Sequence, residues 1–345
     1  MLKKIVCMVM VIILSYSFNG CASVEKSSEI ISDETDNGTG TSANFQESID
    51  IESDDENADE FVPLPKFDDS ATIEETVLYD ENNIRITAIS LEYNYYSARL
   101  NLKFENMSEK NLEFFAETYG YSVNGINDYM IEDGYMHINV AAGESGEDYI
   151  EFAYNELYIH GITEIAEIQV GFDIQDEEYD DIYTEPLTIK TNIAENHNYE
   201  DSGYATIVQS KALKSAYGLD TLYFAQDKIY DSYEISIISE HYLINKNGER
   251  ILILEVQNAT DDTVYFKTNN ITVNDISIYE STWNYESITA NKKMLVTIDL
   301  DNILDEEEWQ EKEISEIESI GFSLETYDDK YNMVSAPMEL VINVK

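Results

Sequence analysis

The strongest constraint on the fold is a stretch of alternating apolar residues that occurs twice in the chain. The first copy is Leu100–Ser108 and the second is Leu252–Thr260. Each has an apolar residue at every second position up to an asparagine, Asn106 or Asn258, and a hydroxyl residue follows two positions later. A period of two residues indicates a strand with one buried face, and the polar end indicates a turn. Because the two asparagines lie 152 residues apart, we infer that one β-rich unit is duplicated.

Further signals follow the repeated stretch in the same order. Val123–Gly125 contains the Asn-Gly pair typical of a β-hairpin, and Val273–Asp275 lies at the corresponding place in the second unit. Ile162–Ile168 and Ile314–Ile320 have apolar residues three positions apart, which favours a short helical turn over a connecting strand. About seven short strands in a unit of about 115 residues, separated by turn signals, indicate an antiparallel β-sandwich. A β-solenoid is disfavoured, because two copies are too few for that architecture.

Both units resemble the tandem immunoglobulin-like (Ig-like) repeats of uncharacterised surface lipoproteins from Gram-positive bacteria. That family combines a strand ending in Asn-x-Ser/Thr with a downstream Val-Asn-Gly and a final Gly-Phe strand. The resemblance implies an all-β chain with two tandem antiparallel Ig-like β-sandwich domains, at residues 71–192 and 203–345, and it assigns no activity. The residues that carry it are Asn106, Ser108, Asn124, Gly125, Gly171 and Phe172 in the first unit and Asn258, Thr260, Asn274, Gly321 and Phe322 in the second, where Asp275 replaces the glycine.

Residues 1–21 have the pattern of a signal peptide. Two lysines precede ten consecutive apolar residues, Ile5–Leu14, which are too few to span a bilayer as a lasting helix. Gly20–Cys21 then resembles the lipobox of bacterial lipoproteins, in which cleavage leaves a lipidated cysteine as the first mature residue. This resemblance predicts acylation, for example by palmitate, at Cys21 and an anchor in the cell membrane on its extracytoplasmic side. The alternative is an ordinary secretory signal that is cleaved nearby.

Residues 22–70 form an acidic segment that we expect to be a disordered tether. It has 15 Asp and Glu residues, two lysines and few large apolar residues, so it cannot bury enough surface to offset the entropy lost on ordering. The cysteine other than Cys21 is Cys7, inside the targeting segment. The mature chain is therefore expected to have no disulfide and to depend on its core for stability.

The chain has 70 acidic and 20 basic residues, a formal net charge of −50. Nucleic-acid binding is disfavoured, because phosphate recognition requires a basic surface. Contact with anionic lipid headgroups is disfavoured for the same reason. The excess acid has two interpretations, a solubility coat and a cation-binding surface, and we favour the first because the acids are dispersed along the chain.

Local motifs do not identify an enzyme. The sequence lacks G-x-S-x-G, H-E-x-x-H, C-x-x-C and a glycine-rich phosphate loop. Its four histidines are scattered, and His137 is interpreted as an ordinary residue of a strand. The acidic clusters Asp176–Asp181 and Asp299–Glu308 have the oxygen ligands that Ca²⁺ prefers, but neither has the glycine of an EF-hand loop. We favour a solvated loop for the first cluster and the start of a charged helix before Trp309 for the second.

Three features are specific to parts of the chain. Asn106, Asn258 and Asn270 lie in N-x-Ser/Thr sequons, for which we favour a role in turns over glycosylation. Aromatic clusters at Tyr93–Tyr96 and Tyr279–Tyr285 are interpreted as sheet-surface tyrosines, with sugar or partner binding at loops as the alternative. Ala205–Ala225 has no counterpart in the first unit; it is either an extension with a strand and a helix or the start of the second domain.

We therefore expect a membrane-anchored extracytoplasmic lipoprotein that acts as a non-enzymatic binding or scaffold module. We predict no catalytic residue, no cofactor and no metal ligand, and Cys21 is the one predicted site residue. The expected partners are the membrane, through the lipid on Cys21, and a protein or other component of the cell envelope. A solute- or cation-binding accessory lipoprotein is the alternative, and a carboxylate-dependent hydrolase is the least favoured interpretation. A function-specific site is expected where the two units differ.

Overall fold

The computed structural model describes residues 62–116, 124–178, 180–199, 203–281, 286–304, 306–328 and 330–345. The predicted signal peptide, Cys21 and most of the predicted tether lie outside these ranges. Asp59–Lys345 is one compact unit. Residues 71–192 are called the first repeat and residues 203–345 the second repeat.

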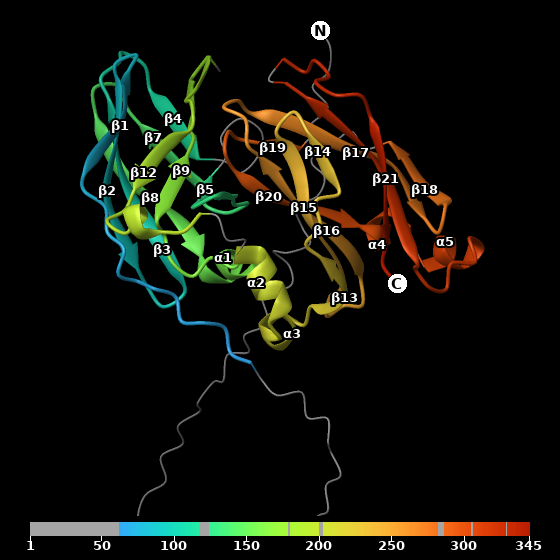
Figure 1. Cartoon of the computed structure of the whole chain (residues 1–345). Helices are drawn as coiled ribbons and strands as arrows, with labels where there is room; N and C mark the ends of the chain where they lie inside the picture. The colour runs from blue at the N-terminus through green and yellow to red at the C-terminus, as the bar shows by residue number, and fades with distance from the viewer. Residues whose placement is uncertain are drawn as a thin grey trace, which may run out of the picture. The chain divides into compact units, whose positions relative to one another are not determined.

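Strands make up about half of the described chain, as the alternating patterns predict (Figure 1). The strands of the first repeat are β1 (Thr76–Glu81), β2 (Ile84–Tyr93), β3 (Ser97–Asn106), β4 (Leu112–Ala116), β5 (Gly125–Ile126), β6 (Tyr129–Met130), β7 (Met136–Val140), β8 (Ser145–Ala153), β9 (Glu167–Val170), β10 (Asp173–Asp176), β11 (Asp181–Tyr183) and β12 (Leu187–Lys190). Those of the second repeat are β13 (Asp220–Ala225), β14 (Tyr230–Ser232), β15 (Ile235–Ile244), β16 (Arg250–Asn258), β17 (Val264–Val273), β18 (Ile276–Ser281), β19 (Glu286–Ile288), β20 (Lys293–Asp299), β21 (Ser319–Tyr327) and β22 (Met338–Asn343).

The helices are all short. They are α1 (Tyr154–Ile159), α2 (Gly203–Gln209), α3 (Ala212–Tyr217), α4 (Leu300–Ile303), α5 (Glu306–Glu311) and the 3₁₀ helix η2 (Ala194–Asn196). None of the helices in the described ranges has the length and apolar composition needed to cross a membrane.

Three sheets belong to single repeats and one is shared (Figure 1). The first repeat contributes the sheets β1-β2-β3-β8 and β11-β10-β4-β7, and the second contributes β18-β17-β21-β22, with β19 also paired to β17. The shared sheet has the order β12-β9-β5-β6-β20-β16-β15-β13, with β14 also on β15. All neighbours pair antiparallel except β6 and β20. The arrangement β2-β3-β8 of the first repeat recurs as β15-β16-β20 in the second.

The repeated stretch forms core strands in both copies. In β3 the predicted apolar face, Leu100, Leu102 and Phe104, is fully buried and the residues between are only half-buried. In β16 both faces are buried, since Ile253 is 8 % exposed and Glu255 is 0 % exposed. The second copy therefore lies deeper in the protein than its period-two pattern indicates.

The helical turn predicted for Ile162–Ile168 and Ile314–Ile320 is wrong in both repeats. Helices α1 and α5 end before these segments, which are irregular and then enter β9 and β21. Gly161 follows α1 with φ +73°, and a Cβ at this position would lie 1.9 Å from the carbonyl oxygen of Gly203. Only glycine fits this close approach between two backbone segments.

An asparagine side chain takes up the backbone groups that a helix would use in these segments. Asn127 Nδ2 donates to the Glu164 carbonyl, and Asn127 Oδ1 accepts from the N–H groups of Ala166 and Glu167, over 2.8–3.1 Å. Because these groups are already bonded, the segment stays extended. The second repeat has the same pattern. Asn274 bonds the carbonyl of Glu316 and the N–H groups of Glu318 and Ser319.

The sequence pattern suggested that Asn124 corresponds to Asn274. The hydrogen bonds show that the corresponding residue is Asn127. Both asparagines have positive φ, +56° and +51°, and both begin the turn of a hairpin. The same bonds align Gly321 with Gln169, so the Gly-Phe pairs of the two repeats do not coincide. Asn124 lies before β5 and donates to two backbone carbonyls of the loop after β6.

A second asparagine bond set closes the repeated stretch. Asn258 Nδ2 contacts the carbonyls of Asp262, Ile288 and Thr289 at 2.8–3.1 Å, and its Oδ1 accepts from the N–H and hydroxyl of Thr260. The first repeat has the same arrangement, in which Asn106 bonds the carbonyls of Lys110 and Val140 and the N–H and hydroxyl of Ser108. Asn106 and Asn258 are 1 % and 0 % exposed. Their amides are inaccessible to a glycosylating enzyme, which confirms the turn interpretation.

The hairpin β5–β6 joins the two repeats. Its Tyr129 lies opposite Lys293 in the parallel β6–β20 contact, and the Lys293 N–H donates to the Asp128 carbonyl at 2.6 Å. Lys293 Nζ also lies 2.6 Å from Asp128 Oδ2, and Lys292 Nζ lies 2.8 Å from Glu167 Oε1. Both lysines are nearly buried, at 5 % and 6 % exposure.

Polar and apolar contacts complete this joint. The Tyr129 hydroxyl donates to Glu255 Oε1 over 2.5 Å, and Met130 is part of the hydrophobic core of the second repeat. Thr289 donates its N–H to Met130 Sδ and its hydroxyl to Gln169 Oε1. Each repeat therefore supplies side chains that the other one buries.

The segment Ala205–Ala225, which has no counterpart in the first unit, was predicted to contain one helix and a strand. The structure has two helices and a strand there. Helices α2 and α3 precede β13, which lengthens the edge of the shared sheet by pairing with β15. The counterpart of β1 is β14, because each forms the hairpin that leads into the next strand, β2 or β15. Residues 203–225 are thus an addition in front of the repeated unit.

Asn258→Ala is expected to lower the free energy of unfolding by about 2 to 4 kcal/mol. The substitution leaves three buried carbonyls without their side-chain donor and removes the acceptor for Thr260. Urea unfolding of the full chain measures the effect. Asn139→Ala, at an exposed position of β7, is the matched control and is expected to change stability by less than about 0.5 kcal/mol. Equal effects of the two substitutions would contradict a structural role for Asn258.

Candidate functional site

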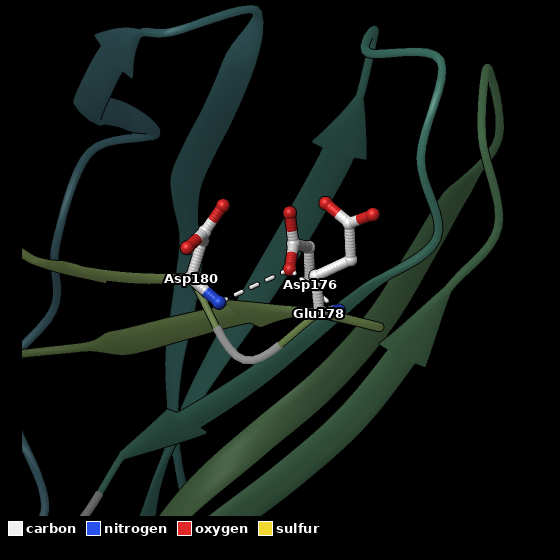
Figure 2. Close-up of side chains that lie close together, drawn as sticks. All are labelled: Asp176, Glu178 and Asp180. Carbon is white, nitrogen blue, oxygen red and sulfur yellow. Dashed lines mark hydrogen bonds between the residues drawn. The ribbon is translucent and has the colours of Figure 1, made fainter.

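The first acidic cluster lies in the turn after β10. Carboxylate oxygens of Asp176, Glu178 and Asp180 lie within 4.8 Å of one another, and Figure 2 shows the three side chains around the turn. Asp176 Oδ1 accepts hydrogen bonds from the N–H groups of Glu178 and Asp180, at 2.8 and 3.1 Å. One carboxylate thus shapes the turn that carries the other two.

A lysine already pairs with two of the three carboxylates of this cluster. Lys110 Nζ bonds Asp176 Oδ2 and lies 3.0 Å from Glu178 Oε2. The hydrogen bond from Lys110 and those from the backbone hold the pKa of Asp176 below its ordinary value. The ammonium group fills the cationic role for which a calcium ion was considered, so we assign the cluster to the stability of the turn.

The second acidic cluster also makes structural bonds. Asp299 caps α4 by accepting from the N–H groups of Asp301 and Asn302, each at 3.0 Å. Asp301 pairs with Arg250 through both carboxylate oxygens, and the Arg250 guanidinium lies 3.9 Å from the centre of the Trp309 ring. A charged helix before Trp309 was predicted, and α5 includes this residue.

A third group of acids, which sequence patterns did not reveal, combines both repeats. Glu132 and Asp133 lie in the loop after β6, Glu156 is in α1, and Glu286 begins β19 of the second repeat. Desolvation by the surrounding protein, together with repulsion from Glu132, raises the pKa of Glu286 to about 7. Desolvation, with repulsion from Asp133 and Glu132, likewise raises the pKa of Glu156 to about 7. These residues are far apart in the sequence and share no motif, so only the fold brings their charges into range of one another.

A buried polar network lies behind the joint between the repeats. Glu255 accepts from the Tyr129 hydroxyl and, at 2.7 Å, from the Ser239 hydroxyl. His241 lies between the hydroxyls of Tyr204, in α2, and Thr221, in β13, at 2.7 and 2.9 Å. Burial lowers the pKa of His241 to about 4, so the ring is neutral and its two nitrogens can serve one donor and one acceptor. Glu255, Ser239 and His241 are fully buried and act in packing, whereas Thr221 lies at the exposed end of the network.

The other histidines have separate structural neighbours. His137, on the exposed face of β7, lies 3.1 Å from Glu113 and is stacked on Phe115, as expected of a strand residue. His160 Nδ1 lies 2.9 Å from the carbonyl of residue 156, and His197 lies 2.7 Å from Glu164. The Asp176–Glu178–Asp180 cluster is the one place in the described ranges where three His, Cys, Asp or Glu side chains lie close enough to share a metal ion.

Glu240 is a buried carboxylate without a partner. The residue is 1 % exposed, and neither carboxylate oxygen has a hydrogen-bond partner in the described part of the chain. Desolvation, followed by repulsion from Asp227, raises the pKa of Glu240 to about 7. In the shared sheet, Glu240 lies opposite Leu254 in β16 and Ala225 in β13.

A shallow groove of about 430 Å³ lies on the second repeat, between β14 and the segment before β22. Its walls are mainly apolar, and the hydroxyl of Ser335, one of the lining residues, is bonded to those of Tyr230 and Thr326. Such a combination is typical of binding surfaces. The lining residues are Tyr230, Ser232, Tyr233, Met333, Val334, Ser335, Ala336 and Met338.

The first aromatic cluster singled out from the sequence is divided between core and surface. Tyr95 and Tyr96 form an edge-to-face pair at the turn between β2 and β3 and are 85 % and 74 % exposed. Phe67, just before the first repeat, lies 6.3 Å from Tyr93 and stacks on Tyr154. In the second cluster, residues 282–285 lie outside the described ranges.

Comparisons with known proteins do not assign a family. No family model and no curated protein matches the chain. Solved structures with weak similarity include red sea bream transglutaminase (7 % identity, TM-score 0.18, 79 % of this chain and 31 % of that chain) and a GH2 β-galacturonidase from Eisenbergiella tayi (6 %, 0.18, 72 % and 35 %). A third is the CsuC–CsuE chaperone–tip adhesion subunit complex of Acinetobacter baumannii (10 %, 0.19, 70 % and 90 %). This chain spans about a third of the first two, and similarity at this level carries no functional argument.

Glu240→Gln is expected to stabilise the protein at neutral and alkaline pH. The folded pKa of Glu240 is raised, so the folded state binds more protons than the unfolded state between about pH 4.5 and pH 7, and the stability contributed by this residue falls as pH rises through that window. At pH 8 the variant should be more stable than wild type by about 1 to 3 kcal/mol, with no difference near pH 4.

Urea unfolding of both proteins from pH 4 to pH 8 measures this difference. Glu147→Gln, at an exposed position of β8, is the control that should not change the pH profile. A constant difference across the pH range would contradict ionisation of Glu240 as the cause.

Proposed function

We propose that the protein is a membrane-anchored extracytoplasmic lipoprotein that acts as a non-enzymatic binding or scaffold module. Cys21 carries the lipid, and residues 22–70 connect it to the folded part, on which the end of this segment is packed at Phe67. Two Ig-like β-sandwiches, one from each repeat, present the binding surfaces. The observation that supports this proposal best is the joint between the repeats. Its nearly buried ion pairs, Lys292 with Glu167 and Lys293 with Asp128, hold the repeats in one arrangement suited to displaying a fixed surface.

The use of the acidic residues supports the same proposal. The clusters at Asp176 and Asp299 stabilise a turn and a helix start, and the buried His241 packs between two hydroxyls. A hydrolase remains the least favoured interpretation.

The two Ig-like sandwiches are proposed from strand order and hydrogen bonding. Both repeats have the strand arrangement β2-β3-β8 or β15-β16-β20, the asparagine bonds that end the repeated stretch, and the asparagine turn at Asn127 or Asn274. A shared set of three local arrangements supports a duplication of one domain rather than a single irregular fold.

Cys21→Ala is expected to release the protein from the membrane fraction of the producing cells. Acyl chains stabilise membrane binding by about 0.8 kcal/mol for each buried CH₂ group, and the rest of the predicted mature chain is too acidic to adhere to anionic lipid. Fractionation followed by immunoblotting measures the shift. Cys7→Ala, in the predicted signal peptide, is the matched control and should leave the protein at the membrane. Retention of Cys21→Ala at the membrane would refute the lipid anchor.

A further inference from the structure

The hairpin that joins β14 to β15 places a tyrosine in a backbone conformation that is unfavourable for a bulky residue. Its two-residue turn is Tyr233–Glu234, with φ +54° and +59°. The first repeat has the same turn between β1 and β2, where the two residues are Asn82 and Asn83, with φ +53° and +60°. Asparagine tolerates positive φ, whereas a bulky side chain is strained there. The second repeat therefore carries backbone strain that the first one avoids.

The two turns occupy equivalent places in the fold. In both repeats the carbonyl of the second turn residue accepts a backbone hydrogen bond of 2.8 Å. The donor is the Met107 N–H for Asn83 and the Ala259 N–H for Glu234. Tyr233 therefore stands where an asparagine satisfies the same turn without strain. Strained backbone of this kind is found where the side chain has a use, as in ligand-binding surfaces.

Tyr233 forms part of the wall of the groove between β14 and the segment before β22. Its side chain is 64 % exposed, and Met333 and Met338, which line the groove from the other segment, are exposed as well. Methionine side chains adapt to ligands of different shape. The hydroxyl of Ser335 already makes two hydrogen bonds within the protein. The groove thus offers mainly apolar contacts, which favours a peptide with apolar side chains over a sugar.

The strands beside the groove have free edges. Among the described strands, β14 pairs only with β15 and β22 pairs only with β21. An extended peptide can add its backbone to such an edge and direct every second side chain to the same face. The edge of β14 and the adjoining apolar groove together suit a peptide in this conformation.

The charges next to the groove favour a basic peptide. Glu234 and Glu339 directly follow the lining residues Tyr233 and Met338; both are exposed, and neither has an ion-pair partner in the described ranges. The lysines nearest to them in the sequence already have acidic neighbours, Lys228 at Asp231 and Lys330 at Asp328. The whole chain also has a net charge of −50. A Lys or Arg on the peptide would therefore be attracted to the ends of the groove.

From these observations we propose that the groove binds an extended peptide segment of another protein, which has two apolar side chains two positions apart and a Lys or Arg at one end. The apolar side chains contact Tyr233 and Met333, the basic one pairs with Glu234 or Glu339, and the peptide backbone pairs with β14. The acidic segment 22–70 of this chain is disfavoured as the occupant, because the two glutamates would repel it. This inference rests on the proposed binding function and names its surface and the chemistry of its partner.

Selection from a displayed library of random dodecapeptides tests the proposal. The full chain, purified in detergent, is the target, and enriched peptides are synthesised and titrated by fluorescence anisotropy. They are expected to contain the two apolar residues and the basic residue. Tyr233→Asn installs the residue that the first repeat has in this turn. It should lower peptide affinity at least about fivefold by removing the aromatic wall, and raise the urea midpoint of unfolding by removing the strain. A residue with only a structural role would not combine weaker binding with higher stability.

Two further variants complete the test. Met333→Lys places a positive charge in the facing wall and should also weaken binding, whereas Tyr95→Asn, at an exposed position of the β2–β3 turn, should leave the affinity unchanged. Peptides that bind wild type, Tyr233→Asn and Met333→Lys equally well would overturn the groove while leaving the proposed binding function intact. The inference would also be overturned by a lack of enriched peptides, by enriched peptides without the basic residue, or by a lower urea midpoint for Tyr233→Asn. Membrane fractionation of Cys21→Ala tests the anchor separately.

Discussion

The arrangement of the two repeats depends on two nearly buried lysines. Lys292 and Lys293 have lost most of their hydration, and such a charge is strongly unfavourable unless an opposite charge lies beside it. Glu167 and Asp128 supply that charge only when the β5–β6 hairpin lies against the start of β20. Sliding the hairpin along β20 would leave buried charges unpaired, so the ion pairs select one register and make the shared sheet possible.

The asparagines perform the corresponding task within each repeat. Asn106 and Asn258 bond buried carbonyls at the end of a core strand. Asn127 and Asn274 bond the backbone of a hairpin turn to the start of a neighbouring strand, β9 or β21. Duplication of these bonds explains why the repeated residues are structural. The parts that differ between the copies are the added α2–α3–β13 segment and the environment of the two asparagine hairpins, of which one is buried at the joint and the other is exposed.

Several features were predictable because they depend on local chemistry. The apolar alternation of β3 and the polar turn after Asn106 are both present, and the acids near Trp309 do precede and enter a helix. Two predictions failed where a distant side chain intervened. The apolar spacing of Ile162–Ile168 predicted a helical turn, but Asn127 bonds the backbone of this segment. The Asn124-Gly125 pair predicted a hairpin turn, but the turn forms three residues later, at Asn127. Sequence spacing cannot reveal a hydrogen bond between groups that are about 40 positions apart.

The sequence by itself determined the β class of the described chain and the duplication of its strand pattern, since side-chain alternation is set by the backbone of each strand. The tertiary structure decided which acids interact. Asp176 and Glu178 lie against Lys110, and Glu255 and Glu240 are buried in strands of the shared sheet. Desolvation, with repulsion from other acids, raises the pKa of Glu156 and Glu286. Charge is a property of each residue, but the pKa and the partner of that charge depend on the atoms that surround it. Only the folded chain brings those atoms together.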